Sequence, residues 1–189
     1  YDMYLRLLND AVLEQQGKTA PTRVECSADI TVAAYIPESY VPAARQRMDL
    51  YRRIAALRTP EDESELTDEL LDRYGDVPPP VTALLRVALL RAAAMDCGVT
   101  DITQKGRQLV FSFDDRVDPA ALLAVCTMAA YRSRAQLSAG AAPRLTLYMQ
   151  PGEEPLAAAG AVVEALRLHQ ADTQQMNGAQ TAEEAKHEE

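Results

Sequence analysis

The chain of 189 residues has only two histidines, three cysteines and no tryptophan. No Cys-x-x-Cys or His-x-x-x-His pair occurs, so the spacing that is typical of a metal site is missing. The cysteines, Cys26, Cys97 and Cys126, are odd in number and far apart, which argues against a disulfide framework and favours reduced thiols in a cytoplasm. A catalytic pairing of Cys126 with His169 is conceivable, but a cysteine on the apolar face of a helix usually serves packing. We therefore expect a cytoplasmic chain without a metal site.

Long apolar runs and an excess of basic residues are also missing. No apolar run approaches the roughly 20 residues that cross a bilayer, so no membrane protein is expected. The net charge of −9 disfavours a surface that holds nucleic acid by neutralising phosphates, and a basic partner surface is the more natural counterpart. Residue 1 is a tyrosine inside a helical pattern, from which we expect a piece of a longer protein.

The hydrophobic content of 48% suffices for one core. Period-3.6 patterns predict helices over residues 2–16, 42–58, 60–74, 81–95, 118–126 and 155–169. Alternating or β-branched runs predict strands over residues 24–36, 100–104, 109–113, 131–137 and 145–149. The predicted fold class is α+β, a single domain with a helical first half packed on a small antiparallel sheet. We assign residues 1–20 to an entry helix, 21–169 to the domain and 170–189 to a disordered acidic tail.

The predicted helix 60–74 has clear start and stop signals. Thr59 is placed to cap it, Pro60 suits its first position and Asp62 completes a capping box. Gly75 suits the left-handed residue that ends such a helix. Its carboxylates are dense and have no basic residue among them: Glu61, Asp62, Glu63, Glu65, Asp68, Glu69 and Asp72.

Glu69 and Asp72 differ from the other acids because they lie in the last turn, where the helix dipole disfavours anions. They are three residues apart and share a face, so we interpret them as a surface site for a cationic group of a partner. An ordinary solvated face is the alternative, and Arg73 could pair back to Glu69 at i,i+4. The partner hypothesis requires that the pair is not already neutralised by arginines of this chain.

Two other motifs were weighed for chemistry. Gly17-Lys18-Thr19 resembles the end of a phosphate-binding loop, but Val12 stands where that motif needs a glycine and a helix precedes it. Arg132, Arg134 and Arg144 would put positive charge on one sheet face, which makes a nucleic-acid-binding accessory domain the alternative function. Surface aromatics do not interleave these arginines, so that signal is weak.

Several segments of the chain resemble the C-terminal region of bacterial transcription-repair coupling factors. They are Tyr1 to Val12, Ala33 to Pro42, Leu50 to Ala55, and Glu69-Leu-Leu-Asp-Arg-Tyr-Gly75 with the prolines after it. The resemblance covers the first hundred residues well and is looser beyond Gly98, where it depends on the order of hairpin, helix, strand and final helix.

This resemblance implies a non-catalytic part of a DNA repair protein. The family is a superfamily 2 DNA translocase that removes stalled RNA polymerase and recruits UvrA. The ATP and magnesium sites of the family would lie upstream, so no cofactor is expected here. Residues 1–20 would form the helix that connects the second translocase lobe to this domain. The terminal domain would be autoinhibitory: it would cover the UvrA-binding surface of the N-terminal UvrB-like module until the enzyme engages RNA polymerase and DNA through other domains. The resemblance implies that Glu69, Asp72 and Arg73 form the contact that holds this domain against the UvrB-like module. We call this contact the clasp.

Overall fold

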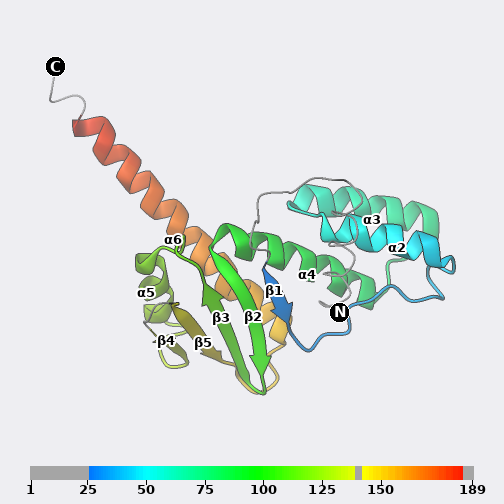
Figure 1. Ribbon diagram of the computed structural model, residues 1–189, viewed down its shortest axis with the longest axis horizontal. Helices are drawn as coiled ribbons and strands as arrows, with labels where there is room; N and C mark the ends of the chain where they lie inside the picture. Colours follow the sequence, from blue (N-terminus) through cyan, green and yellow to red (C-terminus); the bar gives the residue numbers. More distant parts are fainter. Residues whose placement is uncertain (1–25, 139–141, 185–189) are drawn as a thin grey trace.

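The computed structural model describes residues 26–138 and 142–184 of the chain (Figure 1). The helix expected over residues 2–16 and the motif Gly17-Lys18-Thr19 lie outside the described residues. The described chain forms a group of helices beside a sheet, and a long C-terminal helix extends away from both (Figure 1). This is the α+β class that the sequence predicts.

Between β1 and β2 the described chain forms three helices: α2 (Ala44–Ala55), α3 (Pro60–Tyr74) and α4 (Pro79–Asp96). They run side by side in Figure 1, and both α2 and α3 contact α4. Their apolar stripes meet in the core, which buries Leu50, Ile54, Leu66, Leu70, Leu84 and Leu85. Burial of each such side chain contributes about 1.5–3 kcal/mol to folding, so packing holds these helices in place.

Helix α3 begins as its sequence predicts. The hydroxyl of Thr59 accepts a hydrogen bond from the Asp62 amide at 3.2 Å, and the Asp62 carboxylate accepts one from the Thr59 amide at 3.0 Å. This capping box satisfies two amides that the helix leaves without internal partners. At the other end Gly75 has a φ of 81°, which a residue with a side chain rarely adopts. Both the start and the stop of α3 are therefore set by local residues.

The sheet has five strands: β1 (Ser27–Asp29), β2 (Val99–Lys105), β3 (Gln108–Phe113), β4 (Ala135–Ser138) and β5 (Arg144–Tyr148). Their spatial order is β1-β2-β3-β5-β4. The strands predicted over residues 100–104 and 109–113 are confirmed as β2 and β3, which form a hairpin with its turn at Gly106. The sheet is mixed and not purely antiparallel as expected, because β1 comes from the first half of the chain and pairs parallel to β2.

One face of the sheet carries the core. Along β3 and β5 the residues Leu109, Phe111, Leu145 and Leu147 are fully buried, while Val110 and Thr146 between them are partly exposed. The covering helices are α4, α5 (Pro119–Thr127) and α6 (Pro155–Glu184). Figure 1 shows α6 running along one side of the sheet. Among the described residues no polar or charged residue is buried, so the charged groups lie at the surface.

Two predicted elements differ from the structure. The strand expected over residues 131–137 begins only at Ala135, because the preceding residues form turns in which the Tyr131 amide bonds to the Met128 carbonyl at 2.9 Å. Of the strand expected over residues 24–36, the structure describes residues 26–36, and within these Ser27–Asp29 forms the strand that pairs with β2.

The C-terminal segment also differs from the expectation. Helix α6 continues to Glu184, past residue 170, where a disordered tail was expected to start. Alanine, glutamine and glutamate dominate this stretch and are good helix formers, so local propensity favours its helical form. Within the described residues, no helix has both the length and the apolar character of a membrane span.

Candidate functional site

The three residues assigned to a partner site lie together at the end of α3. Glu69, Asp72 and Arg73 occupy its last two turns, just before Gly75. The side chain of Glu69 is 33% exposed and that of Arg73 is 44% exposed, and Asp72 is exposed as well. The structure thus brings the three groups to one end of one helix, at the molecular surface.

Glu69 is already bound by two arginines of its own chain. Arg73 Nη1 donates a hydrogen bond to Glu69 Oε1 at 2.8 Å, which is the i,i+4 pairing that the sequence left open. Arg53 of α2 donates two more, from Nη1 to Oε1 at 2.8 Å and from Nη2 to Oε2 at 2.5 Å. Hydrogen bonds from Arg53 and then from Arg73 lower the pKa of Glu69 from 4.5 to about 2. The condition that the pair be free of the chain's own arginines therefore fails for Glu69.

Asp72 meets that condition. It is exposed, and it forms no ion pair with any residue that the structure describes. Its negative charge stands in the last turn of α3, against the partial negative charge of the helix C-terminus. Asp72 is thus the member of the pair whose charge the fold leaves uncompensated.

A tyrosine that sequence reasoning missed fixes this end of the helix. The hydroxyl of Tyr40 lies 3.2 Å from the Leu70 carbonyl oxygen and 3.1 Å from the Gly75 carbonyl oxygen, and it donates its hydrogen to these terminal acceptors. The Tyr40 and Tyr74 rings lie 5.6 Å apart, and the Arg73 guanidinium stacks 5.1 Å from the Tyr74 ring centre. The loop before α2 therefore holds the last turn of α3 in one position.

A groove between α2 and α3 borders the Arg53–Glu69 ion pair. Its volume is about 320 Å³, and it is lined by Arg53, Leu57, Asp62, Glu65, Leu66 and Glu69. Asp62 is engaged in the capping box, and the amides of Arg58 and Thr59 lower its pKa. Glu65 is exposed and forms no ion pair within residues 26–138 and 142–171. The groove is therefore acidic and open to solvent, with one guanidinium at its edge.

The arginines of the alternative function do not form one sheet face. Arg132 and Arg134 precede β4, and only Arg144 belongs to a strand. Arg134 donates to both oxygens of Glu153, at 2.5 and 3.1 Å, and it stacks 5.5 Å from the Tyr131 ring centre. Its charge is thereby neutralised inside the protein. Only Arg132 and Arg144 are left exposed, which weakens the case for a nucleic-acid-binding face.

Two of the three cysteines, Cys97 and Cys126, are poorly placed for reactivity. Burial raises the pKa of Cys97 to about 11 and also raises the pKa of Cys126, so both thiols stay protonated near neutral pH. A protonated thiol is a poor nucleophile, which argues against catalysis by Cys126 with His169. Within the described part of the chain, no cluster of histidine, cysteine and acidic residues could hold a metal ion.

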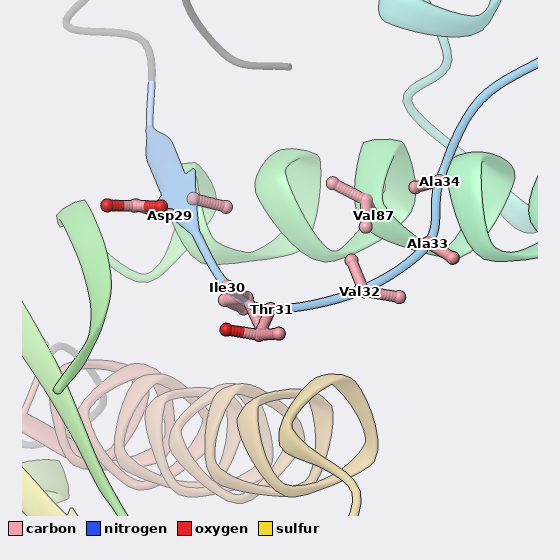
Figure 2. A pocket seen from close by; sticks show the side chains of 8 residues that line it. Asp29, Ile30, Thr31, Val32, Ala33, Ala34 and Val87 are labelled. Carbon is pink, nitrogen blue, oxygen red and sulfur yellow. The ribbon is translucent and has the colours of Figure 1, made fainter. Parts of the chain in front are cut away.

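A second cavity lies where the segment after β1 crosses α4. Its volume is about 510 Å³, and its lining is Ala28, Asp29, Ile30, Thr31, Val32, Ala33, Ala34 and Val87. Figure 2 shows Val87 of α4 facing the extended segment that carries Val32 and Ala34. Asp29 is the one ionisable group among these eight residues, so the cavity has no pair of groups for acid–base work.

The fold and the charged end of α3 define an α+β module whose ionic groups lie on its surface. The model of the family described as "TRCF domain" matches residues 30–122, a span that contains both α3 and the groove. This match assigns residues 30–122, just under half of the chain, to that family.

Several relatives are transcription-repair-coupling factors. The Bacillus subtilis protein is 38% identical over 95 residues, which are 50% of this chain and 8% of that protein. The Myxococcus xanthus protein is 35% identical over 96 residues, or 51% of this chain and 8% of that protein. The Staphylococcus haemolyticus protein is 30% identical over 118 residues, or 61% of this chain and 10% of that protein. The chain therefore spans at most a tenth of the length of these curated relatives.

A solved structure shares the fold. The crystal structure of the C-terminal domain of a transcription-repair coupling factor superposes with a TM-score of 0.66 at 20% identity. The superposition covers 75% of this chain and 91% of that domain. At this level of identity the similarity establishes the fold.

Proposed function

We propose that this chain is the autoinhibitory region of a longer transcription-repair coupling factor. In this proposal the end of α3 docks onto a cationic surface of the UvrB-like module near the N-terminus of the same protein, and it covers the surface that binds UvrA. The region itself is not catalytic, and ATP-driven DNA translocation belongs to the upstream part of the protein. The masked surface becomes free when that part engages stalled RNA polymerase and DNA. The match of residues 30–122 to the TRCF-domain model supports this proposal.

The observation that carries the proposal is the position of Asp72. It is an exposed carboxylate in the last turn of a helix, where the dipole opposes it by about 0.3–1 kcal/mol, and it forms no ion pair within the described chain. A cationic group on a partner removes this penalty and adds a charge-assisted hydrogen bond. Asp72 therefore favours the docked state over the free state.

The rigidity of the helix end also supports docking. Tyr40 anchors the carbonyl groups of Leu70 and Gly75, on either side of Asp72. A surface that is already ordered before binding loses less conformational entropy in the complex. The contact can therefore form without a rearrangement of α3.

The strength of such a contact suits a reversible clasp. An exposed ion pair contributes about 0.2–1 kcal/mol, and salt screens it. A few pairs acting together still move a two-state equilibrium appreciably, because each 1.4 kcal/mol changes the ratio of closed to open protein tenfold. The closed state is thus stable at rest and can be opened by binding energy from other domains.

The experiment is a binding titration between this chain and the UvrB-like module of the same protein, supplied as a separate polypeptide. Asp72→Asn is expected to weaken binding about twofold to fivefold at low salt, and raised salt is expected to reduce the difference. Glu61→Gln is the matched control, because it removes one exposed charge from the opposite end of the same helix. Equal affinities for Asp72→Asn and the unmodified chain would refute the proposed contact.

A further inference from the structure

The ion pair between Arg53 and Glu69 occupies the oxygens that a partner would need. Arg53 contacts both oxygens of the carboxylate, and Arg73 shares Oε1. A carboxylate has about four lone-pair positions, and three of them are taken. A second bidentate guanidinium cannot bind Glu69 in the same plane while Arg53 remains. Bidentate docking of a partner arginine on Glu69 therefore requires that Arg53 leave.

Arg53 is free to leave because the pair is exposed. Its side chain is 47% exposed and that of Glu69 is 33% exposed, so water solvates both groups during an exchange. Surface ion pairs of this kind are weak, and their partners are readily replaced. Arg73 stays on the same helix as Glu69 and does not join α3 to α2. Arg53 is thus the partner that a docking surface would displace.

A second acceptor for Arg53 lies in the same groove. Glu65 stands one helical turn before Glu69 on α3, and both line the groove between α2 and α3 together with Arg53. Glu65 is exposed and is not engaged by any described cation. The other acid of the groove, Asp62, is held by the capping box. Among the described acids that line the groove, Glu65 is therefore the one available to a guanidinium that leaves Glu69.

We propose that Arg53 is an ion-pair switch for the clasp. In the undocked domain Arg53 holds Glu69, and in the docked domain Arg53 pairs with Glu65 while a cation of the partner takes Glu69. Arg53 therefore competes with the cation of the partner for Glu69. Its pairing with Glu65 offsets part of the free energy that is lost when Arg53 leaves Glu69. This inference rests on the proposed function, because it concerns how the same surface is regulated. As a consequence, the clasp is weaker than it would be if Glu69 had no arginine partner in the undocked domain.

The test measures the affinity of UvrA for the full-length protein, in which a tighter clasp means weaker UvrA binding. Arg53→Gln removes the competitor, and UvrA binding is expected to weaken about twofold to fivefold. Glu65→Gln removes the second acceptor, and UvrA binding is expected to strengthen by about twofold to fivefold. In the Arg53→Gln background, Glu65→Gln is expected to have no further effect. Glu61→Gln, on the same helix but outside the groove, is the control for loss of one negative charge.

The outcomes separate this inference from the proposed function. Stronger UvrA binding by the double variant Glu69→Ala with Asp72→Ala supports the clasp. If UvrA binding by Arg53→Gln is then also stronger, or is unchanged, Arg53 is not a switch, although the clasp is still supported. The switch is also overturned if Glu65→Gln matches Glu61→Gln. If the Glu69 and Asp72 double variant changes nothing, the clasp itself is wrong and the switch falls with it. Circular dichroism of each variant confirms that the exposed substitutions leave the fold intact.

Discussion

Arg134 and Glu153 form a bidentate ion pair that ties the turn before β4 to the start of α6. Both side chains are mostly enclosed, at 15% and 24% exposure, and Glu153 also accepts a hydrogen bond from the Gln150 amide at 2.8 Å. Hydrogen bonds from Arg134 are the main cause of the lowered pKa of Glu153. An arginine that the sequence assigns to a binding face is thus a structural residue.

Glu153→Gln is expected to lower the free energy of unfolding by about 1–2 kcal/mol, because it leaves the enclosed Arg134 guanidinium without its counter-ion. Urea denaturation of the isolated chain measures the change. Glu164→Gln is the matched control, since its pair with Arg167 is 52% and 58% exposed, and we expect a change below about 0.5 kcal/mol. Equal losses in the two variants would contradict the structural role of Arg134.

Gly98→Ala is expected to destabilise the junction of α4 and β2. Gly98 has a φ of 75°, and a Cβ atom there would lie 2.9 Å from the Val117 amide nitrogen. Strain and the clash together are expected to cost about 1–3 kcal/mol in thermal or urea unfolding. Gly160→Ala is the opposite control, because it lies inside α6 with no atom within 4 Å of the added carbon, and it is expected to stabilise by up to about 1 kcal/mol. A neutral result for Gly98→Ala would show that the junction adapts.

The helices show how much of this fold local sequence determines. Thr59, Pro60, Asp62 and Gly75 predict both ends of α3, and the structure confirms all four roles, because capping depends on residues within one turn. The hairpin at Gly106 was predictable for the same reason. The pairing of β1 with β2 joins Ser27 to Asp101, and no local pattern encodes a contact between residues so far apart in the chain.

The candidate site was predictable in part. The position of Glu69 and Asp72 at the surface follows from the helical period and from the inward face of Leu66 and Leu70. The contact with Arg53 could not be predicted, because it depends on the way α2 packs beside α3. The alternation of Arg132 and Arg134 resembled a strand, but turns precede β4, so tertiary context overrode the local pattern.

The ion pairs of Glu69 make part of the stability dependent on pH. Because the pKa of this carboxyl is lowered from 4.5 to about 2 in the folded chain, its contribution is fully present above pH 4.5 and is lost as the pH falls toward 2. The difference in unfolding free energy between the unmodified chain and Glu69→Gln is expected to shrink over that range. In NMR titrations, Arg53→Gln is expected to move the Glu69 midpoint back toward its ordinary value. A midpoint that does not move would show that Arg53 is not the main partner in solution.

Weak DNA binding is expected of the isolated chain. Its net charge is −9, and of the three arginines assigned to the sheet face Arg134 is neutralised internally. A fluorescence titration with labelled duplex DNA is expected to show no saturation below about 100 µM protein at low or moderate salt. Tight binding that weakens steeply with salt would favour the alternative of a nucleic-acid-binding domain. Arg144→Gln and Arg132→Gln would then locate the surface.

The affinity of UvrA for the full-length protein tests the central claim most directly. With Glu69→Ala and Asp72→Ala together, the clasp is expected to open and UvrA binding to strengthen about tenfold or more relative to the unmodified protein, while Glu61→Gln has no effect. Unchanged UvrA affinity in a folded double variant would contradict the account, because it would show that the acidic end of α3 does not hold the UvrA-binding surface closed.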